Sequence, residues 1–252
     1  MAGSPKGFAD DKFALQDEQY QFPYHHIPHF DGESPSNIRR LGWGLEYLCY
    51  LRILVERVRE LAPASLLDVG CGDGRFLGLV GAAVARRKGV DLSTSAIGFA
   101  RAFHPEVQFE AVDAAELTEQ FDAVTSIETL EHVPDEGIGG FLRTLAARSR
   151  DHVLISVPTT AVPLNKKHYR HYDLELLERQ VAESEAPLAL VGHEYIYRGS
   201  RLMTALRWAT SNRLWTLEIA AVQDLAWRYV WKRLRTATAR DGHHLLAHYR
   251  RR

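Results

Sequence analysis

Three glycines at alternate positions, Gly70, Gly72 and Gly74, follow the apolar segment 65–69 and precede an amphipathic segment that begins at Arg75. Glycine has no Cβ, so its backbone can take positive φ in a tight turn and approach a ligand closely. A strand that leads through a glycine-rich turn into a helix N-terminus is typical of nucleotide-binding sites. The stretch therefore predicts a strand, a ligand-binding loop and a helix in immediate succession.

The spacing of these glycines excludes two common nucleotide-binding loops. A dinucleotide-binding fingerprint needs a further glycine, which Phe76 and Leu77 do not supply, and no Lys-Ser/Thr pair closes a phosphate-binding P-loop. With Asp68 directly before it, the loop suits a cationic nucleoside better than a pyrophosphate.

Strand and helix patterns alternate along most of the chain, which favours an α/β fold with a doubly wound, mostly parallel sheet between two helical layers. A long amphipathic helix with Ser36 as N-cap precedes this region, and a helical insertion over 200–238 follows it. We divide the chain into an arm and cap helix (1–62), a core (63–199) and an insertion with a final strand (200–252) that complete the same domain. The seven expected strands are 65–69, 87–91, 107–111, 121–127, 152–157, 188–198 and 243–249, and the main expected crossover helices are 75–84, 94–103, 138–148 and 174–185.

The composition is that of an ordinary globular protein, with 46% hydrophobic residues and a net charge of −1 over 252 residues. The charge is unevenly distributed: from Arg201 onward there are 11 Lys/Arg and 3 Asp/Glu. This basic region fits either an anionic substrate or a solvated helix face. The 2 cysteines provide no disulfide framework, and neither a signal peptide nor a membrane-spanning segment is evident, so we expect a cytoplasmic protein.

Aromatic residues gather near both ends of the chain. The arm before Phe30 carries His25, His26 and His29 among tyrosines and phenylalanines, and it is interpreted either as a lid over an acceptor pocket or as a packed arm. The tryptophans of the C-terminal region fit either an acceptor pocket or a helix-packing core; they are Trp208, Trp215, Trp227 and Trp231.

The segment 66–173 resembles the class I S-adenosylmethionine (SAM)-dependent methyltransferases, with the motif Asp68-Val-Gly70-Cys-Gly72-Asp-Gly74 and the later acids in the expected order. The resemblance implies the class I fold with an antiparallel last edge, and SAM as cofactor. It implies that Asp91 holds both ribose hydroxyls and that Asp113 reads the adenine amino group. The cofactor contacts implied together are Asp68, Gly70, Cys71, Gly72, Asp91, Leu92, Asp113, Ala114, Ile127 and Glu128.

An acid–histidine cluster follows the fourth expected strand. Glu128, Glu131 and His132 share one face if the chain turns helically there. The segment is similar to that of the ubiquinone-pathway O-methyltransferases and of the small-RNA 2′-O-methyltransferases, which implies a divalent metal (Mg²⁺, Mn²⁺ or Zn²⁺) held by Glu128, Glu131, His132 and His171. The alternative is that these side chains only cap and orient the loop. His132, Glu128 and His171 are the candidate catalytic residues, with a histidine as general base if no metal is present.

The cluster favours an oxygen acceptor, because an alcohol needs a base or a metal to lose its proton, whereas a neutral amine does not. We expect an O-methyltransferase acting on a hydroxyl of a sugar, glycan or other small metabolite. Two alternatives stay open: an RNA 2′-O-methyltransferase, favoured by the basic C-terminal region, and a SAM-binding regulator without catalysis. No RNA-binding module is recognisable, and the sequence does not specify the acceptor or the oligomeric state.

Overall fold

The computed structural model describes residues 29–31, 33–36, 41–210, 212, 214–215, 217 and 219–252. The expected roles of His25 and His26 in a lid or packed arm fall outside these residues. The backbone of His29 is described, in the first of two short strands.

These strands, β1 (His29–Asp31) and β2 (Ser34–Ser36), form a small antiparallel hairpin. Ser36 pairs with His29 in it. Residues 37–40 are not among those described, so the expectation that Ser36 caps the long helix stays a prediction. The helix α2 (Leu41–Leu61) is described from Leu41 onward, and it ends before Pro63 as the sequence predicts.

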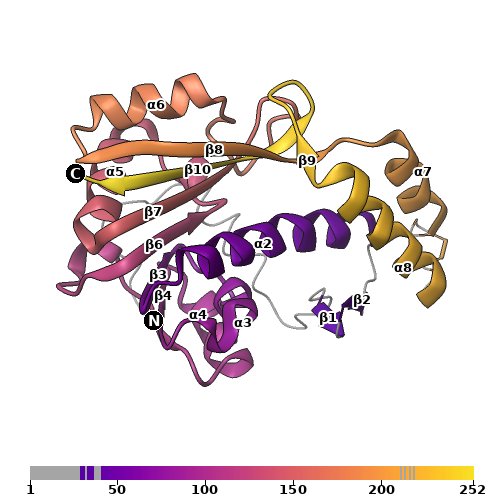
Figure 1. Ribbon diagram of the computed structural model, residues 1–252, viewed down its shortest axis with the longest axis horizontal. Helices are drawn as coiled ribbons and strands as arrows, with labels where there is room; N and C mark the ends of the chain where they lie inside the picture. The colour runs from indigo at the N-terminus through magenta and orange to yellow at the C-terminus, as the bar shows by residue number, and fades with distance from the viewer. Residues whose placement is uncertain are drawn as a thin grey trace.

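A single large sheet forms the centre of the fold (Figure 1). In the described part of the chain it has eight strands in the order β5-β4-β3-β6-β7-β10-β8-β9, of which the first five are parallel and the last three antiparallel. The mostly parallel sheet and its antiparallel edge are confirmed. The strands are β3 (Ser65–Val69), β4 (Arg86–Val90), β5 (Gln108–Glu110), β6 (Phe121–Ile127), β7 (Ser149–Pro158), β8 (Leu188–Arg198), β9 (Thr236–Ala237) and β10 (Gly242–Arg251).

The expected number of seven strands is one too low. The extra strand is β9, which pairs with β8 at the sheet edge inside the region expected to be helical throughout. Two residues are too few for a periodic pattern, so the sequence carries no signal for this strand.

Successive side chains of the central strands enter opposite cores. Leu66 of β3 packs in the core on one side of the sheet, whereas its neighbour Leu67 packs in the core on the other; Ala123 and Val124 of β6 divide in the same way. Because side chains alternate across a strand, this apolar run buries both faces. The expected three layers, helix–sheet–helix, follow from it.

The helices cover both faces, with α2, α3 and α4 on one and α5 and α6 on the other. The expected starts of α4 and α6 are confirmed. The side chain of Ser93 accepts a hydrogen bond from the N–H of the third residue of α4, and the side chain of Asp173 does the same for α6. The helices are α3 (Arg75–Val80), α4 (Thr94–Phe103), α5 (Asp135–Arg148), α6 (Leu174–Glu183), α7 (Arg201–Thr210) and α8 (Ala220–Tyr229), which continues into the π-helical turn η5 (Val230–Leu234).

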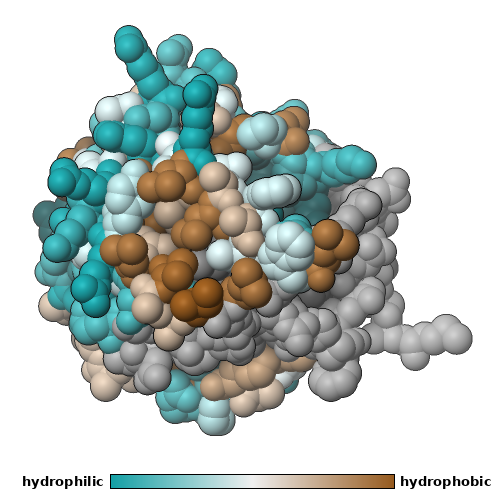
Figure 2. Space-filling view, turned by 90° about the vertical axis from the view of Figure 1, so that its right-hand side faces the viewer, coloured by the Kyte–Doolittle hydropathy of each residue, from teal (hydrophilic) through white to brown (hydrophobic). Residues whose placement is uncertain are grey.

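The C-terminal helices pack against α2 at one end of the molecule (Figures 1 and 2). Met203, Trp227 and Leu234 share a hydrophobic core with α2. Trp227 and Trp231 stack with ring centroids 5.5 Å apart, as expected for helix packing. Among the described residues no helix combines the length and the apolar character needed to cross a bilayer.

Strand order reverses between β3 and β6, because the chain goes from β3 out to β4 and β5 and then returns to the other side of β3. In open α/β sheets, ligands bind beyond the carboxyl ends of the strands at such a reversal. The glycine loop follows β3 and the acid–histidine cluster follows β6, so the fold places both at this position.

Candidate active site

The glycine loop has the backbone that its sequence predicts. Gly70, Gly72 and Gly74 all have positive φ, at 77°, 53° and 75°. The N–H groups of Gly70 and Cys71 donate to the carbonyl of Val90, which fastens the loop to the end of β4. A Cβ on Gly70 would lie 2.4 Å from the side chain of Thr129, so glycine is required for space as well as for conformation.

Asp91 organises the loop from the neighbouring strand. One carboxylate oxygen accepts the N–H of Gly72 and the other accepts the N–H of Ser93, each at 2.9 Å. A carboxylate oxygen has two lone pairs, so each can accept one further hydrogen bond. Two neighbouring acceptor oxygens fit a ligand with two adjacent hydroxyls.

Asp68 lies beneath the loop and is buried. Burial, with a smaller effect from the charge of Asp91, raises the pKa of Asp68 to about 7, although Thr125 Oγ1 donates to it at 2.7 Å. A buried carboxyl with this pKa ionises readily when a cation comes near. The site therefore complements a positively charged group close to the loop.

The other expected cofactor residues lie around the same edge. Asp113 is exposed and its carboxylate accepts the N–H of Ala115, while Ala114 is buried and Leu92 is half-buried. Cys71 is buried, and burial raises the pKa of its thiol well above the usual range, so it lies in the loop as a packing residue.

Glu128 follows β6 with φ of 50°, a conformation that non-glycine residues seldom adopt. Such strain is often found at functional sites. Thr129 Oγ1 donates to the carbonyl of Ile127 and contacts that of Gly70 at 3.5 Å. The acid–histidine segment therefore lies directly against the glycine loop.

The carboxylate of Glu128 belongs to a buried network that sequence reasoning missed. It accepts a hydrogen bond from Ser156 Oγ at 2.7 Å, and it lies 3.1 Å from His244 Nδ1. The carboxylate of Glu46, on α2, lies 3.3 Å from His244 Nε2. It also accepts a hydrogen bond from His243 Nδ1 at 2.7 Å. Neither contact of His244 has the geometry of a hydrogen bond, and both are ion pairs. The one sequence signal for this network is Glu46, an acid within the apolar pattern of α2.

The contacts in this network shift the pKa values of its histidine and its two carboxylates in opposite directions. Burial disfavours a charged ring, but Glu128 and Glu46 outweigh it and raise the pKa of His244 to about 10. Burial likewise opposes ionisation of Glu128 and Glu46, yet the histidines hold the pKa of Glu128 below its usual range and that of Glu46 at about 2. An imidazolium between two carboxylates is the resulting arrangement at neutral pH.

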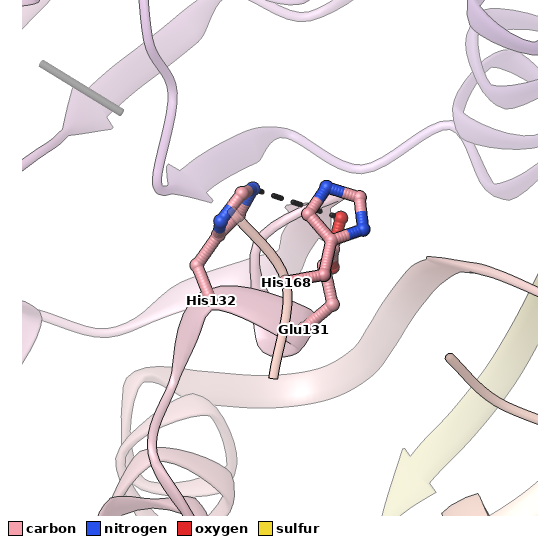
Figure 3. A group of neighbouring side chains, drawn as sticks. All are labelled: Glu131, His132 and His168. Carbon is pink, nitrogen blue, oxygen red and sulfur yellow. Dashed lines mark ion pairs between the residues drawn. The ribbon is translucent and has the colours of Figure 1, made fainter. Parts of the chain in front are cut away.

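A second group lies beside it. The ligand-capable atoms of Glu131, His132 and His168 all lie within 4.8 Å of one another (Figure 3). Burial and the negative charge of Glu128 raise the pKa of Glu131 well above its usual range, and its Oε2 has no hydrogen-bond partner. A buried, unsatisfied carboxyl beside two imidazoles fits a cation better than it fits the protein alone.

The hydrogen bonds of the histidines indicate their tautomers. His132 Nδ1 lies 3.1 Å from the carbonyl of Lys167, so Nδ1 carries the proton and Nε2 is an acceptor. His171 Nδ1 donates to the carbonyl of Val162 in the same way, so its Nε2 accepts from His168 Nδ1 at 2.8 Å. Nε2 of His168 is then also an acceptor.

The expected metal ligands are therefore divided between two groups. The structure brings Glu131 and His132 together with His168, which the sequence analysis did not select. His171 lies behind His168 as its hydrogen-bond partner, and Glu128 is paired with His244. All of these residues surround the carboxyl end of β6.

Comparison with known proteins identifies the family of this chain. Residues 45–206 match the model of the family described as "Methyltransferase domain". The ubiquinone biosynthesis O-methyltransferase of Burkholderia ambifaria is 37% identical over 103 residues, which are 38% of this chain and 40% of the relative. That of Aromatoleum aromaticum is 40% identical over 90 residues, 32% and 38% of the two chains. The chain thus spans about two fifths of the length of these relatives.

Solved structures share the whole fold at low sequence identity. Magnesium protoporphyrin IX methyltransferase from Synechocystis with bound SAM has a TM-score of 0.60 and 16% identity, covering 98% of this chain and 100% of that one. The N-methyltransferase NodS from Bradyrhizobium japonicum, in complex with S-adenosyl-l-homocysteine, has a TM-score of 0.58 and 14% identity over 96% and 99%. Because the family match covers more than half of the chain, this protein belongs to the methyltransferase-domain family, and its fold is that of the class I SAM-dependent methyltransferases.

Proposed function

We propose that this protein transfers a methyl group from SAM to a hydroxyl of a sugar, glycan or other small metabolite, with a divalent cation at Glu131, His132 and His168. The observation that carries the proposal is the contact of Thr129 with the glycine loop, which places this acid–histidine group beside the cofactor loop. The names of the curated relatives given above state O-methylation.

The residues of the loop fit SAM. The remaining lone pairs of the Asp91 carboxylate suit the two ribose hydroxyls, and the exposed Asp113 suits the adenine amino group. Asp68, with a pKa of about 7, supplies a negative charge near the cationic end. When bound, SAM supplies an electrophilic methyl on a sulfonium that already carries its leaving group.

The acceptor needs a group that takes its proton. As the new O–CH₃ bond forms and the S–CH₃ bond breaks, the hydroxyl proton must leave. If no cation is bound, His132 is suited to receive it at Nε2, because its Nδ1–H is directed to the Lys167 carbonyl. With a cation bound, this nitrogen would be a ligand, and the ion would ease loss of the proton by lowering the pKa of the hydroxyl. The network of Glu128 and His244 holds the wall of the site in place without supplying this proton acceptor, because the His244 ring is already protonated at neutral pH.

The cation site rests on the chemistry of its donor set. Glu131 Oε2 and the acceptor nitrogens of His132 and His168 are oxygen and imidazole ligands, which suit Mg²⁺, Mn²⁺ or Zn²⁺. An ion held there would lower the pKa of an acceptor hydroxyl. His171 would fix the ring of His168 in the ligating tautomer.

Metal binding is tested by titrating the metal-depleted protein with Mn²⁺ and following its paramagnetic signal. His168→Ala should weaken affinity by about a hundredfold and His171→Gln by about tenfold. His152→Ala, at a histidine pair elsewhere in the sheet, should leave it unchanged. Equal affinity in all four proteins would rule out this cation site.

Methyl transfer is tested with radiolabelled SAM against a panel of sugars, glycans, phenolic metabolites and small RNAs, with and without chelator. The proposal expects labelled ether product from a small hydroxyl acceptor, and loss of product in His132→Ala. Labelling of RNA alone, with activity falling steeply as salt rises, would favour the RNA 2′-O-methyltransferase instead. Tight SAM binding without transfer to any acceptor would favour a regulator.

A further inference from the structure

The hairpin formed by α7 and α8 (residues 201–229) has the largest concentration of exposed apolar side chains in the described part of the chain. Of the ten large apolar residues that are exposed there, seven belong to this hairpin. Figure 2 shows hydrophobic residues, in brown, gathered on this end of the molecule with hydrophilic side chains along one side of them. The seven residues are Leu202, Trp208, Leu214, Trp215, Leu217, Ile219 and Leu225.

The helix α7 exposes apolar side chains as well as burying them. Met203 and Leu206 pack with the core against α2. Leu202 and Trp208 are 60% and 72% exposed. Trp208 lies on the side of the helix away from Met203, and Leu202 lies at the border of the packed side. Packing against α2 does not account for these two side chains, because a surface helix needs one apolar stripe, and they therefore indicate a second apolar environment.

Hydrogen bonds join the described residues between the two helices to the end of α7 and to one another. The N–H of Leu217 donates to the carbonyl of Thr210, and the N–H of Asn212 donates to that of Trp215. Trp215 Nε1 donates to the carbonyl of Ala209. Leu214 is 83% exposed beside them. These described residues therefore add exposed apolar side chains to those of α7.

Basic residues accompany this apolar surface. Among the described residues between 201 and 235, six are Arg or Lys and all six are exposed, whereas the sole acid is the half-buried Asp224. Arg228 lies one turn after Leu225 on the outer side of α8. Apolar and tryptophan side chains beside Arg and Lys are the composition of surfaces that lie in a membrane interface.

We propose that the α7–α8 hairpin docks the protein onto the surface of an anionic lipid bilayer. The tryptophans and leucines enter the headgroup boundary, and the arginines and lysines contact the lipid phosphates. A second copy of the chain fits this surface less well, because two identical basic surfaces repel each other. Nucleic acid would leave Leu202, Leu214 and Ile219 without a partner. The contact lies on the membrane, since no described helix spans one.

Flotation of the full chain with vesicles tests this proposal. Vesicles of equal parts phosphatidylcholine and phosphatidylglycerol should carry the protein, and pure phosphatidylcholine vesicles should carry about tenfold less. Trp208→Ser with Leu214→Ser should weaken binding by about a hundredfold. The matched control, Leu164→Ser with Val191→Ser, replaces two exposed apolar residues outside the hairpin and should bind as the wild type does.

The charges are tested separately. Arg207→Gln with Arg228→Gln should lower binding to the anionic vesicles by about tenfold, while Arg179→Gln with Arg252→Gln should leave it unchanged. All variants change exposed side chains, so unchanged SAM binding and circular dichroism will verify that each is folded. Failure of the wild type to float, equal flotation of the hairpin variants, or self-association that is lost in Trp208→Ser with Leu214→Ser would overturn the proposal.

Discussion

The two sides of the active site are built in different ways. The proposed cofactor side consists of the glycine loop and Asp91, which directly follow parallel strands, and Asp113, which lies three residues after the end of β5. The acceptor side draws Glu46 from α2, Glu128 and His132 from the segment after β6, His168 from a loop, and His244 from the last strand. A local sequence motif suffices for the first side, whereas the second forms only when distant segments pack together. Variants on the two sides should therefore fail differently.

The largest effect is expected on the acceptor side, from His244→Asn. Removing the buried imidazolium takes a cation from two half-buried carboxylates, which costs up to about 3–5 kcal/mol of unfolding free energy. Urea unfolding measures this cost. His248→Asn is the matched control, because it changes a partly buried histidine of the same strand without touching a carboxylate pair. Equal costs for the two variants would contradict the network.

The coupling within the network is tested by Glu46→Gln, alone and combined with His244→Asn. Because the two residues interact, the double variant should lose less stability than the sum of the single ones. Strict additivity would show that the ion pair contributes nothing.

On the cofactor side the largest effect is expected from Gly70→Ala. The added Cβ meets Thr129 and the positive φ disfavours alanine, so the loop must move, and SAM affinity should fall by about a hundredfold in calorimetric titration. Gly98→Ala is the control, because its Cβ would point into open space on α4. Its SAM affinity should not change, and its helix should be stabilised by about 0.5–1 kcal/mol.

The pH dependence of stability follows from His244. Its pKa is about 10 in the folded protein and about 6.5 in an unfolded chain, so the folded state binds the proton more tightly. The stabilisation is complete below about pH 6.5 and is lost as the pH rises through about 10. Between about pH 7 and 9 the wild type should lose about 2 kcal/mol relative to His244→Asn in urea unfolding. A pH-independent difference would contradict the charged imidazole.

The smallest effect is expected from the local helix cap of the cofactor side. Ser93→Ala removes the side chain that accepts the N–H of Ala96 and should cost about 1 kcal/mol in unfolding free energy. Ser95→Ala, at an exposed position of the same helix, should cost much less. If the cap costs as much as His244→Asn, then the contrast between a locally built side and an assembled one is wrong.

Sequence patterns predicted most of the sheet and its crossover helices, because those patterns are local. The bounds of β3, β6 and β8 agree with the expected ranges residue for residue. The hairpin of β1 and β2 was not expected, because two strands of three residues are too short to show a periodic pattern. The tryptophans could not be sorted from sequence either: Trp227 is buried and Trp208 is exposed, although both lie in similar helical patterns.

The sequence by itself determined the class of this protein, since alternating glycines and the acids after successive strands place a SAM-type site on any sheet built from them. The tertiary structure alone decided the acceptor side. Glu46 and His243 are 197 positions apart and meet because α2 packs beside the end of β10. Likewise His168 rather than His171 faces Glu131, because the hydrogen bond of His171 to the Val162 carbonyl turns it to support its neighbour. Such contacts depend on packing and burial between distant segments, which no local periodicity records.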